Sequence, residues 1–270
     1  MHERERQRII LSAVQERPVA TVQDIVELTG VSEATIRRDI AALALQGRLR
    51  KVRGGAEALH PPQIGTLTAR PFRVSESVNI AQKRAIAREA VKLCQDGDSI
   101  IINGGTTTFQ MVHHLAGRRL QVLTNSFAIA EHLVKNTKCT TIVPAGAVYR
   151  EQNIILSPFE NDGTAHFYAK RMFMGAQGVS PLGIMESDSL IIQSEQRLMR
   201  QADELVLLVD SSKFQTRSSL ILCPLERATT IVTDDAVTDE ARRMIETAGI
   251  TLVIAEIEGA ADRKRSSSVA

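Results

Sequence analysis

The chain has 270 residues, with 33 Lys and Arg against 31 Asp and Glu, and 43% of its residues are hydrophobic. This length accommodates one small and one larger domain, and the larger can bury a substantial core. We expect neither a membrane span nor a secretory signal, because no run of about 18 apolar residues occurs and the first residues, MHERERQR, are polar. A cytoplasmic location is therefore expected.

The cysteine and histidine pattern argues against a metal site. The three cysteines, Cys94, Cys139 and Cys223, are widely spaced and odd in number, as expected for reduced thiols in the cytoplasm. The adjacent pair His113 and His114 points in different directions on a helix, which indicates surface or partner residues rather than ligands. The sequence predicts no metal and no cofactor.

Residues 21–59 predict two short amphipathic helices followed by a basic hairpin. Thr21 is expected to cap the first helix, with Asp24 three residues later as a variant of the capping box. The buried face of that helix would consist of Ile25, Val26 and Leu28. Gly30 then provides the left-handed conformation that a sharp turn requires.

The second helix has the features of a DNA-recognition helix. Ser32 is a suitable N-cap, and Ile36, Ile40 and Leu43 repeat at spacings of four and three residues, so they are predicted to face inward. The exposed N-terminal half of a recognition helix reaches base edges and phosphates, and arginine binds guanine or phosphate in a bidentate manner. The residues left exposed there are Ala34, Thr35, Arg37 and Arg38.

A basic wing is predicted after the second helix, which Gly47 ends. Residues 49–52 can pair with residues 56–59 around a tip of Arg53, Gly54 and Gly55, so that Arg50, Lys51 and Arg53 line the hairpin. Positive charge is concentrated here, since residues 32–53 hold six Lys or Arg and two Asp or Glu. Phosphate neutralisation by such a surface makes DNA binding dependent on salt.

An ordinary helical hairpin with a solvated charged face is the alternative interpretation. The combination of cap, turn, inward triplet and basic wing within forty residues favours a winged helix-turn-helix that binds DNA. The residues expected to form its DNA surface are Thr21, Ser32, Ala34, Thr35, Arg37, Arg38, Arg50, Lys51, Arg53, Gly54 and Gly55.

These motifs resemble the DeoR family of bacterial transcriptional regulators. Arg8 in the first helix, the SEATIRRDI segment from Ser32 to Ile40 and the KVRGGA segment from Lys51 to Ala56 carry the resemblance. It extends through the chain to about Ile257. The resemblance implies a regulator that binds operator DNA.

The rest of the chain divides into a linker, a larger domain and a tail. Two prolines and a glycine break the periodicity in residues 60–66, which predicts a linker over residues 60–75 between a DNA-binding domain at 1–59 and an effector domain at 76–258. A helix is expected from Glu76 to Leu93, with an inner face of Ile80, Ala81, Ile86, Ala87 and Val91. The polar residues 259–270 are expected to form a disordered tail.

Buried strands alternate with helices in the larger domain, which predicts a three-layer α/β fold that receives ligands at the carboxyl ends of its strands. The seven expected strands cover residues 99–103, 121–124, 140–144, 171–175, 204–210, 229–233 and 251–254. The helices expected between them cover residues 108–116, 127–135, 190–202 and 239–247.

Polar loops follow several of these strands. The loop from Asn103 to Thr108 joins a strand to a helix, so its N–H groups and hydroxyls can hold an anion, although a plain tight turn is the alternative. Thr124, Asn125 and Ser126 close the second strand, where helix capping is the alternative. Lys213 can supply a positive charge to a phosphate or a carboxylate, or it is a simple surface lysine.

The same loops resemble the DeoR effector domain, which is similar in fold to ribose-5-phosphate isomerase, glucosamine-6-phosphate deaminase and the CoA-transferases. The resemblance implies a sensor of a phosphorylated sugar. The chain departs from the family pattern at Gly146-Ala147, at Gln177 and at Ser157-Pro158. The residues expected to bind the effector are Gly104, Gly105, Thr106, Thr107, Thr108, Thr124, Asn125, Gly175, Gln177, Glu195 and Lys213.

A sugar-phosphate isomerase-like enzyme is the rival hypothesis. Such chemistry needs a carboxylate as general base, and the segment where related isomerases carry acidic residues contains Gln177, which cannot act as a base. Glu195 and Asp210 remain possible carboxylates, although Glu195 can equally form an ion pair with Arg197 or Lys213. The sequence favours a repressor of a carbohydrate catabolic operon that a sugar phosphate releases, acting as a dimer or tetramer.

Overall fold

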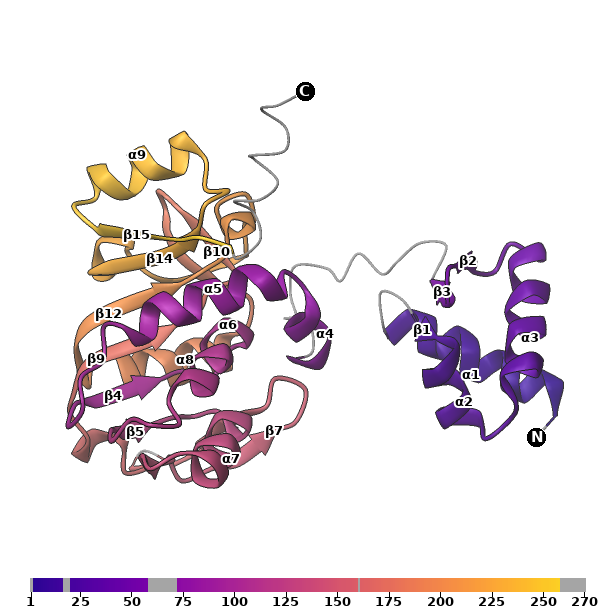
Figure 1. Ribbon diagram of the computed structural model, residues 1–270, viewed down its shortest axis with the longest axis horizontal. Helices are drawn as coiled ribbons and strands as arrows, with labels where there is room; N and C mark the ends of the chain where they lie inside the picture. The colour runs from indigo at the N-terminus through magenta and orange to yellow at the C-terminus, as the bar shows by residue number, and fades with distance from the viewer. Residues whose placement is uncertain (1, 17–19, 58–71, 160, 258–270) are drawn as a thin grey trace. The chain divides into compact units, whose positions relative to one another are not determined.

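The computed structural model describes residues 2–16, 20–57, 72–159 and 161–257. Contacts divide the chain into two compact units, residues 1–66 and 67–270 (Figure 1). Each unit has its own hydrophobic core. No helix within the described ranges is long and apolar enough to cross a membrane.

The N-terminal unit packs three helices against a small antiparallel sheet of order β1-β3-β2. Ile36, Ile40 and Leu43 are at most 1% exposed, so the predicted inward triplet of the second helix is confirmed. The elements are α1 (Glu3–Glu16), β1 (Ala20–Thr21), α2 (Val22–Thr29), α3 (Glu33–Leu45), β2 (Arg50–Val52) and β3 (Gly55–Glu57).

The predicted start of α2 is confirmed, and its predicted inner face is partly wrong. Thr21 and Asp24 form a complete capping box, and Gly30 takes a left-handed φ of 68° after the helix. Leu28, however, is 53% exposed. The helix begins at Val22 and buries residues at spacings of three and four, so Val22 and Thr29 join Ile25 on the inner face.

Ser32 stands at the N-cap position of α3, but its side chain does not cap the helix. Its hydroxyl oxygen lies 3.0 Å from the Thr35 hydroxyl instead. Helix α3 is fastened to α1 by Asp39, which is 4% exposed and accepts from Arg6 Nε at 2.7 Å. Asp39 of the Arg-Arg-Asp motif therefore has a structural role.

The wing contains a third strand that the sequence did not predict. Gly55 belongs to β3 and pairs with Thr21 of β1, so Arg53 and Gly54 alone form the tip of the hairpin. A Cβ atom at Gly55 would lie 2.2 Å from the carbonyl oxygen of Ala20. The glycine is required because β1 approaches β3 so closely. The last two residues of the predicted hairpin, 58 and 59, lie outside the described residues.

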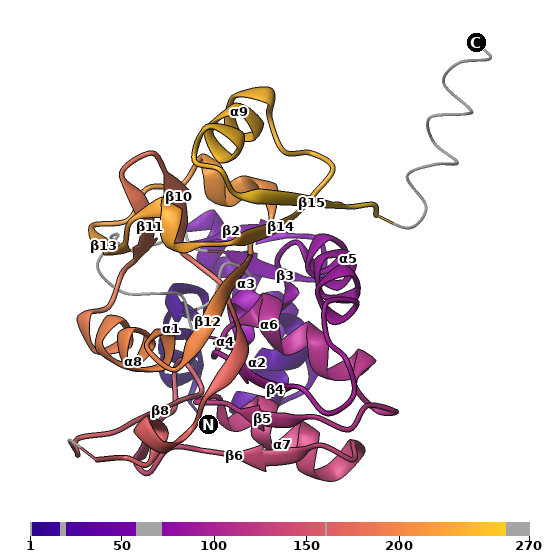
Figure 2. The same ribbon diagram turned by 90° about the vertical axis from the view of Figure 1, so that its left-hand side faces the viewer.

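The C-terminal unit is built on a seven-stranded parallel sheet of order β15-β14-β12-β9-β4-β5-β6 (Figure 2). All seven predicted strands are present. The inner strands are largely apolar, as strands buried on both faces require, whereas β6 is an exposed edge strand. Their bounds are β4 (Ser99–Ile102), β5 (Gln121–Leu123), β6 (Thr140–Ile142), β9 (Ala169–Met174), β12 (Ala202–Leu208), β14 (Thr230–Asp234) and β15 (Thr251–Ala255).

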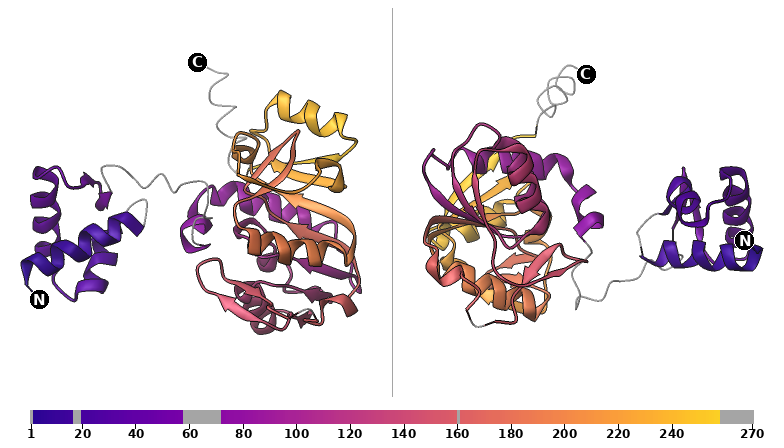
Figure 3. Two further views of the ribbon diagram at one scale, coloured as in Figure 1. Left: turned by 180° about the vertical axis from the view of Figure 1, so that it is seen from behind. Right: turned by 90° about the horizontal axis from the view of Figure 1, so that it is seen from below.

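Helices cover both faces of this sheet, so the predicted three-layer α/β architecture is confirmed. Successive residues of β4 point to opposite faces: Ile100 and Ile102 pack with α5 (Ile80–Val91), whereas Ile101 packs with α8 (Ser189–Met199). Figure 2 shows α5 and α8 on opposite sides of β12, and Figure 3 shows α8, in orange, in front of the sheet when the molecule is seen from behind.

The remaining helices follow the same division. With α5 lie α6 (Thr106–Phe109), the 3-10 helix η1 (Gln110–His114) and α7 (Phe127–Asn136), and with α8 lies α9 (Asp239–Thr247). The predicted helix 108–116 thus starts two residues earlier and changes to 3-10 geometry, and the predicted helix 190–202 ends at Met199. Three further 3-10 helices are η2 (Thr164–His166), η3 (Ser211–Phe214) and η4 (Leu225–Arg227).

Two small antiparallel groups of strands were not predicted. A hairpin, β7 (Ala147–Tyr149) with β8 (Ile154–Leu156), lies beyond β6 in the chain. A three-stranded sheet of order β10-β11-β13 contributes to the core on the α8 face. Its strands are β10 (Gly178–Ser180), β11 (Gly183–Glu186) and β13 (Leu220–Cys223).

The single helix predicted from Glu76 to Leu93 is in fact two helices. The first, α4 (Phe72–Ser77), is separated from α5 by Val78 and Asn79, and Asn79 takes a left-handed φ of 54°. Because α4 begins at Phe72, the last four residues of the predicted linker are helical. The rest of that linker and the predicted tail lie outside the described residues.

The inner face of α5 also differs from the prediction. Ile86, Ala87 and Val91 are buried as predicted, whereas Ala81 is exposed and Ile80 is half-buried. Lys83 is buried in this face with 4% of its surface exposed.

Candidate effector site and DNA-binding surface

The strand order reverses between β4 and β9. From β4 the chain proceeds outward through β5 and β6, and it then returns to place β9 on the other side of β4. In open α/β sheets, ligands bind in the crevice at the carboxyl ends of the strands at such a switch point. The loops that follow β4 and β9 contain Gly104, Thr106 and Gln177, which the sequence predicts as effector-binding residues.

Several groups of the loop after β4 are already used by the protein itself. The Gly104 N–H donates to Asn125 Oδ1 at 2.8 Å. Buried Thr108 donates from its hydroxyl to the carbonyl oxygen of Asn103 at 2.8 Å, so Thr108 supports the loop, and its contact with the effector stays a prediction. Within the described parts of the chain, the hydroxyls of Thr106 and Thr107 form no hydrogen bond to protein and remain for a ligand.

Asn125 joins the loop after β4 to helix α8. It is fully buried and donates from Nδ2 to Ser194 Oγ at 3.2 Å, in addition to accepting from Gly104. The neighbouring residues have structural roles, because the Thr124 hydroxyl accepts from the Ser126 N–H and the Ser126 hydroxyl caps α7. Helix capping is thus confirmed for Ser126, and the effector contact of Thr124 stays a prediction.

Asn103 and Glu195 form a buried polar pair at the switch point. Asn103 Nδ2 donates to Glu195 Oε1 at 2.7 Å, and both side chains are at most 3% exposed. The remaining polar atom of each side chain, Asn103 Oδ1 and Glu195 Oε2, is buried without a hydrogen-bond partner among the described residues. Buried polar atoms are rarely left without a partner in folded proteins, so this pair marks a place for a ligand or water.

Burial favours the neutral form of the Glu195 carboxyl group. Burial, reinforced by the nearby charge of Glu186, raises the pKa of Glu195 well above its ordinary value. Burial likewise raises the pKa of Glu186, whose Oε1 accepts from the N–H of Ser187 at 2.7 Å. The ion pair considered for Glu195 with Arg197 does not form, because Arg197 Nη1 lies 3.6 Å from Asp162 Oδ2 instead.

We therefore predict that Glu195→Gln unfolds at the same or a higher temperature than the wild type at pH 8. The raised pKa means that the wild type loses stability as the pH rises from the unfolded value of 4.5 towards the folded pKa, and glutamine removes that loss. The advantage of the variant should shrink at pH 4. Thermal unfolding at both pH values checks this, and a lower midpoint for the variant at pH 8 would contradict the raised pKa of Glu195.

The remaining predicted effector residues are divided between the loop after β9 and η3. Gly175 and Gln177 are half-buried, and the Gln177 N–H donates to the carbonyl oxygen of Met185 at 3.0 Å. Lys213 is half-buried, and its charge acts on both Glu186 and Lys83. Lys213 thus belongs to a cluster of charged residues with Lys83 and Glu186, and it is not an isolated surface lysine.

Two charged residues of this cluster are buried, and only one of them, Asp210, was considered from the sequence, as a possible carboxylate. Asp210 is 2% exposed and accepts from Asn79 Nδ2 and the Ser212 N–H, both at 3.1 Å. Lys83 is the other, and lysine in a helix is usually read as part of a solvated face. A signal was present, however, because Lys83 precedes buried Ile86 and Ala87 by three and four residues.

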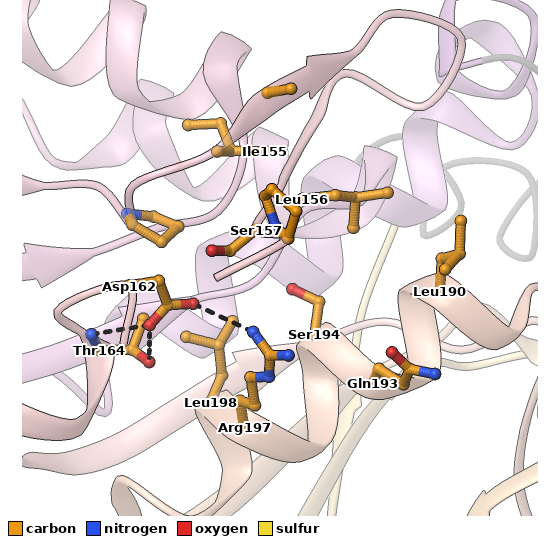
Figure 4. A pocket seen from close by; sticks show the side chains of 13 residues that line it. Ile155, Leu156, Ser157, Asp162, Thr164, Leu190, Gln193, Ser194, Arg197 and Leu198 are labelled. Carbon is orange, nitrogen blue, oxygen red and sulfur yellow. Dashed lines mark hydrogen bonds and ion pairs between the residues drawn. The ribbon is translucent and has the colours of Figure 1, made fainter. Parts of the chain in front are cut away.

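A cavity of about 270 Å³ opens between α8 and the segment that contains β8 (Figure 4). It is separate from the residues predicted to bind the effector, but Ser194 both lines it and accepts from Asn125. Ser157 and Pro158, where the chain departs from the family pattern, are in its wall. The lining residues are Pro144, Ala147, Ile155, Leu156, Ser157, Pro158, Asp162, Thr164, Leu190, Gln193, Ser194, Arg197 and Leu198.

The predicted recognition helix exposes a polar surface at its N-terminal half. Ala34, Arg37 and Arg38 are exposed and Thr35 is half-buried. Arg37 Nη2 donates to Glu33 one turn earlier at 3.0 Å. Arg38 has no ion-pair partner among the described residues, so its guanidinium is available to DNA.

The wing presents its positive charges as predicted, with two qualifications. Lys51 and Arg53 are exposed, whereas Arg50 Nε lies 2.5 Å from Glu57 Oε1 across the hairpin. Gly55 is buried where β3 pairs with β1, so it shapes the wing, and its contact with DNA stays a prediction. Thr21 is an exposed cap, which leaves it accessible at the start of α2.

Two family models match the chain. Residues 6–61 match the DeoR-like helix-turn-helix domain, and residues 78–235 match the DeoR C-terminal sensor domain. The chain belongs to the DeoR family. It is 31% identical over 254 residues to proteins named HTH-type transcriptional regulator UlaR from Shigella flexneri and from Escherichia coli O1:K1, and the match covers 94% of this chain and 99% of each relative.

Solved structures match the DeoR-family chain only partially. Ribose-5-phosphate isomerase A from Methanocaldococcus jannaschii is 21% identical, with 48% of this chain and 52% of that chain covered and a TM-score of 0.36. The translation initiation factor eIF-2B of Pyrococcus horikoshii is 11% identical, with 79% and 67% covered and a TM-score of 0.35. The family assignment rests on the sequence matches alone.

The family matches establish the class of function. This DeoR-family protein is a DNA-binding transcriptional regulator that recognises operator DNA through its helix-turn-helix domain and a small-molecule effector through its sensor domain. Its relatives are named as regulators, which supports a regulator over the rival enzyme hypothesis.

Proposed function

We propose that this regulator is a repressor of a carbohydrate catabolic operon and that a phosphorylated sugar bound at the β4/β9 switch point releases it from DNA. The observation that carries the proposal is the pair of unsatisfied buried atoms, Asn103 Oδ1 and Glu195 Oε2, within the described part of the chain. An amide oxygen accepts a hydrogen bond, and a carboxyl group, whose protonated form burial favours here, donates one when it is protonated. A sugar hydroxyl, which does both, suits this pair.

The phosphate of such an effector would lie beside the loop after β4. Thr106 and Thr107 offer hydroxyl groups there, and Lys213 supplies positive charge to the same cluster. Asn125 would act indirectly, because its two hydrogen bonds fix Gly104 and Ser194 around the site. The proposed contacts thus combine a phosphate end with a hydroxyl end, as a sugar monophosphate requires.

We propose that the working species is a symmetric oligomer. A single winged helix-turn-helix makes few base contacts, and dimers that bind two half-sites one helical turn of DNA apart overcome this. Release then requires that the effector binds one arrangement of the oligomer better than the other. A tenfold to hundredfold preference supplies about 1.4–2.7 kcal/mol at each site, which suffices when several sites act together.

Direct binding measurements test the effector class. Isothermal titration calorimetry should detect binding of one member of a panel of pentose and hexose monophosphates, and much weaker binding of the corresponding free sugar. Binding of a free sugar with equal affinity would remove the phosphate from the proposal. An absence of binding across the whole panel would overturn the proposed effector class.

The double variant Thr106→Ala, Thr107→Ala should lose about a hundredfold or more in affinity for that monophosphate, because two hydrogen bonds to a charged group are each worth about 1.5–3 kcal/mol. DNA binding without effector should stay intact. Thr140→Ala, which removes an exposed threonine on β6, is the matched control. Wild-type affinity in the double variant would place the phosphate elsewhere.

A further inference from the structure

Lys83 is a buried cation that no part of the proposed site has yet explained. It lies in the first turn of α5 with 4% of its surface exposed, and its Nζ donates to the carbonyl oxygen of Ser75 in α4. Burial lowers the pKa of Lys83 to about 8. A buried charge is costly unless it is paired, so a lysine at this position indicates a role for its charge.

Charged groups from three neighbouring elements act on Lys83. Asp210 and Lys213 act on Lys83 from the end of β12 and from η3, and Glu76 acts on it from α4. Asp210 is 2% exposed and already accepts from Asn79 and from the Ser212 N–H. The pKa of Lys83 is lowered despite the two nearby carboxylates, so they compensate the buried ammonium only in part. A bound anionic group would stabilise its charged form further.

Helix α4 connects this cluster to the loop after β4. The ring of Phe72, the first residue of α4, packs edge-to-face on the ring of Phe109 with centroids 5.7 Å apart. Phe109 ends α6, the short helix that starts with Thr106. Figure 1 shows α4, α6 and the adjoining end of α5 together. The Phe72 N–H also donates to the carbonyl oxygen of Glu151, in the turn between β7 and β8.

We propose that Lys83 binds the anionic group of the effector and links its occupancy to α4 through the hydrogen bond with Ser75. The proposal rests on the proposed function and adds a residue to the same site. An ammonium group has three N–H donors, so donation to the Ser75 carbonyl oxygen leaves others for a phosphate oxygen. The charge-assisted bond to phosphate is stronger than the bond to a neutral carbonyl.

This arrangement would couple effector binding to the position of α4. The Lys83 ammonium would bind the phosphate while it holds the last turn of α4 through Ser75. Of the described elements, α4 is the first that follows the DNA-binding unit in the chain. A change in the Lys83–Ser75 bond therefore alters the element next to the connecting segment. The effector shifts the equilibrium only if this bond differs between the two states.

The test uses the full-length protein and three variants. Lys83→Met removes the charge and keeps an unbranched side chain, Lys83→Arg keeps the charge, and Arg84→Met removes one charge from the exposed neighbour as a matched control. Calorimetry with the same panel of pentose and hexose monophosphates and free sugars gives affinities. We expect Lys83→Met to weaken binding of the monophosphate at least tenfold without changing binding of the free sugar, and Arg84→Met to bind as the wild type does.

The pH profile separates a charge contact from a merely structural role. Protonation of Lys83 falls through a pKa of about 8, so wild-type affinity for the monophosphate should fall about tenfold between pH 7 and pH 9. Lys83→Arg, whose guanidinium stays charged, should bind with a nearly flat profile over this range. This second variant keeps the test decisive if Lys83→Met does not fold.

The outcomes distinguish the two proposals. If the wild type binds no monophosphate, the proposed effector class fails. If the wild type binds one and Lys83→Met binds it equally well, or if Lys83→Arg keeps the wild-type pH profile, the assignment of Lys83 is wrong and the effector class stands. If Lys83→Met binds the free sugar and the monophosphate more weakly by the same factor, the assignment of Lys83 is also wrong, because that pattern indicates damage to the site rather than loss of a charge contact.

Discussion

Gly55→Ala should destabilise the N-terminal unit by about 3 kcal/mol or more and abolish operator binding, because inserted atoms in a packed site force the backbone apart. The added Cβ would lie 2.2 Å from the carbonyl oxygen of Ala20 and 3.0 Å from the Cα of Thr21. Those atoms belong to the backbone of β1, so no side chain can move aside. Thermal unfolding and gel shift measure the two effects.

Gly54→Ala is the matched control for this prediction. Gly54 has a φ of 83°, and a Cβ atom added there would have open space within 4 Å, so alanine costs only the backbone strain of about 1 kcal/mol. The two adjacent substitutions should differ clearly in unfolding temperature. Equal, small effects would show that β1 does not pack on β3 as closely as the structure has it.

Arg38→Ala should weaken operator binding by about 1–3 kcal/mol per contact, or about fivefold to 150-fold, while the protein remains folded. Arg38 is exposed on α3, and no ion pair holds it within the described residues. Arg37, in contrast, must leave Glu33 before it can reach DNA, so Arg37→Ala should have the smaller effect. Fluorescence anisotropy with the operator duplex measures both.

The salt dependence of binding identifies what Arg38 contacts. If it contacts a phosphate, Arg38→Ala should weaken binding to all sequences alike and reduce the salt slope by about 1; if it contacts a base, specificity at one position should relax. Arg200→Ala, an exposed arginine of the sensor domain, is the control for the loss of one charge. Unchanged operator affinity in Arg38→Ala at physiological salt would remove Arg38 from the DNA surface.

The parallel sheet and the helix-turn-helix were predictable from the sequence because their signals are long or strongly periodic. Each central strand is a continuous apolar run, and Ile36, Ile40 and Leu43 repeat at the spacing of a helix face. The cap at Thr21 and the turn at Gly30 follow from single residues whose local preferences agree with the fold.

The short elements were not predictable, because two or three residues carry no period. Strand β1 has two residues, and its pairing with β3 gives Gly55 a packing role that a wing tip does not require. The break between α4 and α5 lies at Asn79, which tolerates the left-handed conformation better than most residues but does not by itself end a helix. The helical pattern in the sequence therefore continues through Asn79, and it predicts one helix where the structure has two.

The candidate site was predictable in outline but not in detail. The loops after β4 and β9 were found because polar residues directly follow apolar runs. The interactions that decide their roles join residues far apart in the chain, such as Asn103 with Glu195 and Asn79 with Asp210. Such pairs depend on the three-dimensional arrangement of α5 and α8, so the burial of Lys83 and the structural role of Thr108 became visible only in the fold.

The central claim is that a phosphorylated sugar releases this regulator from its operator, and titration of the preformed complex tests it most directly. The duplex would carry the region upstream of the protein's own gene, with fluorescence anisotropy as the readout at fixed salt. Each pentose and hexose monophosphate would be paired with its free sugar. The account predicts that one monophosphate lowers the anisotropy to that of free DNA while its free sugar does not. Specific binding that no monophosphate reverses would contradict it.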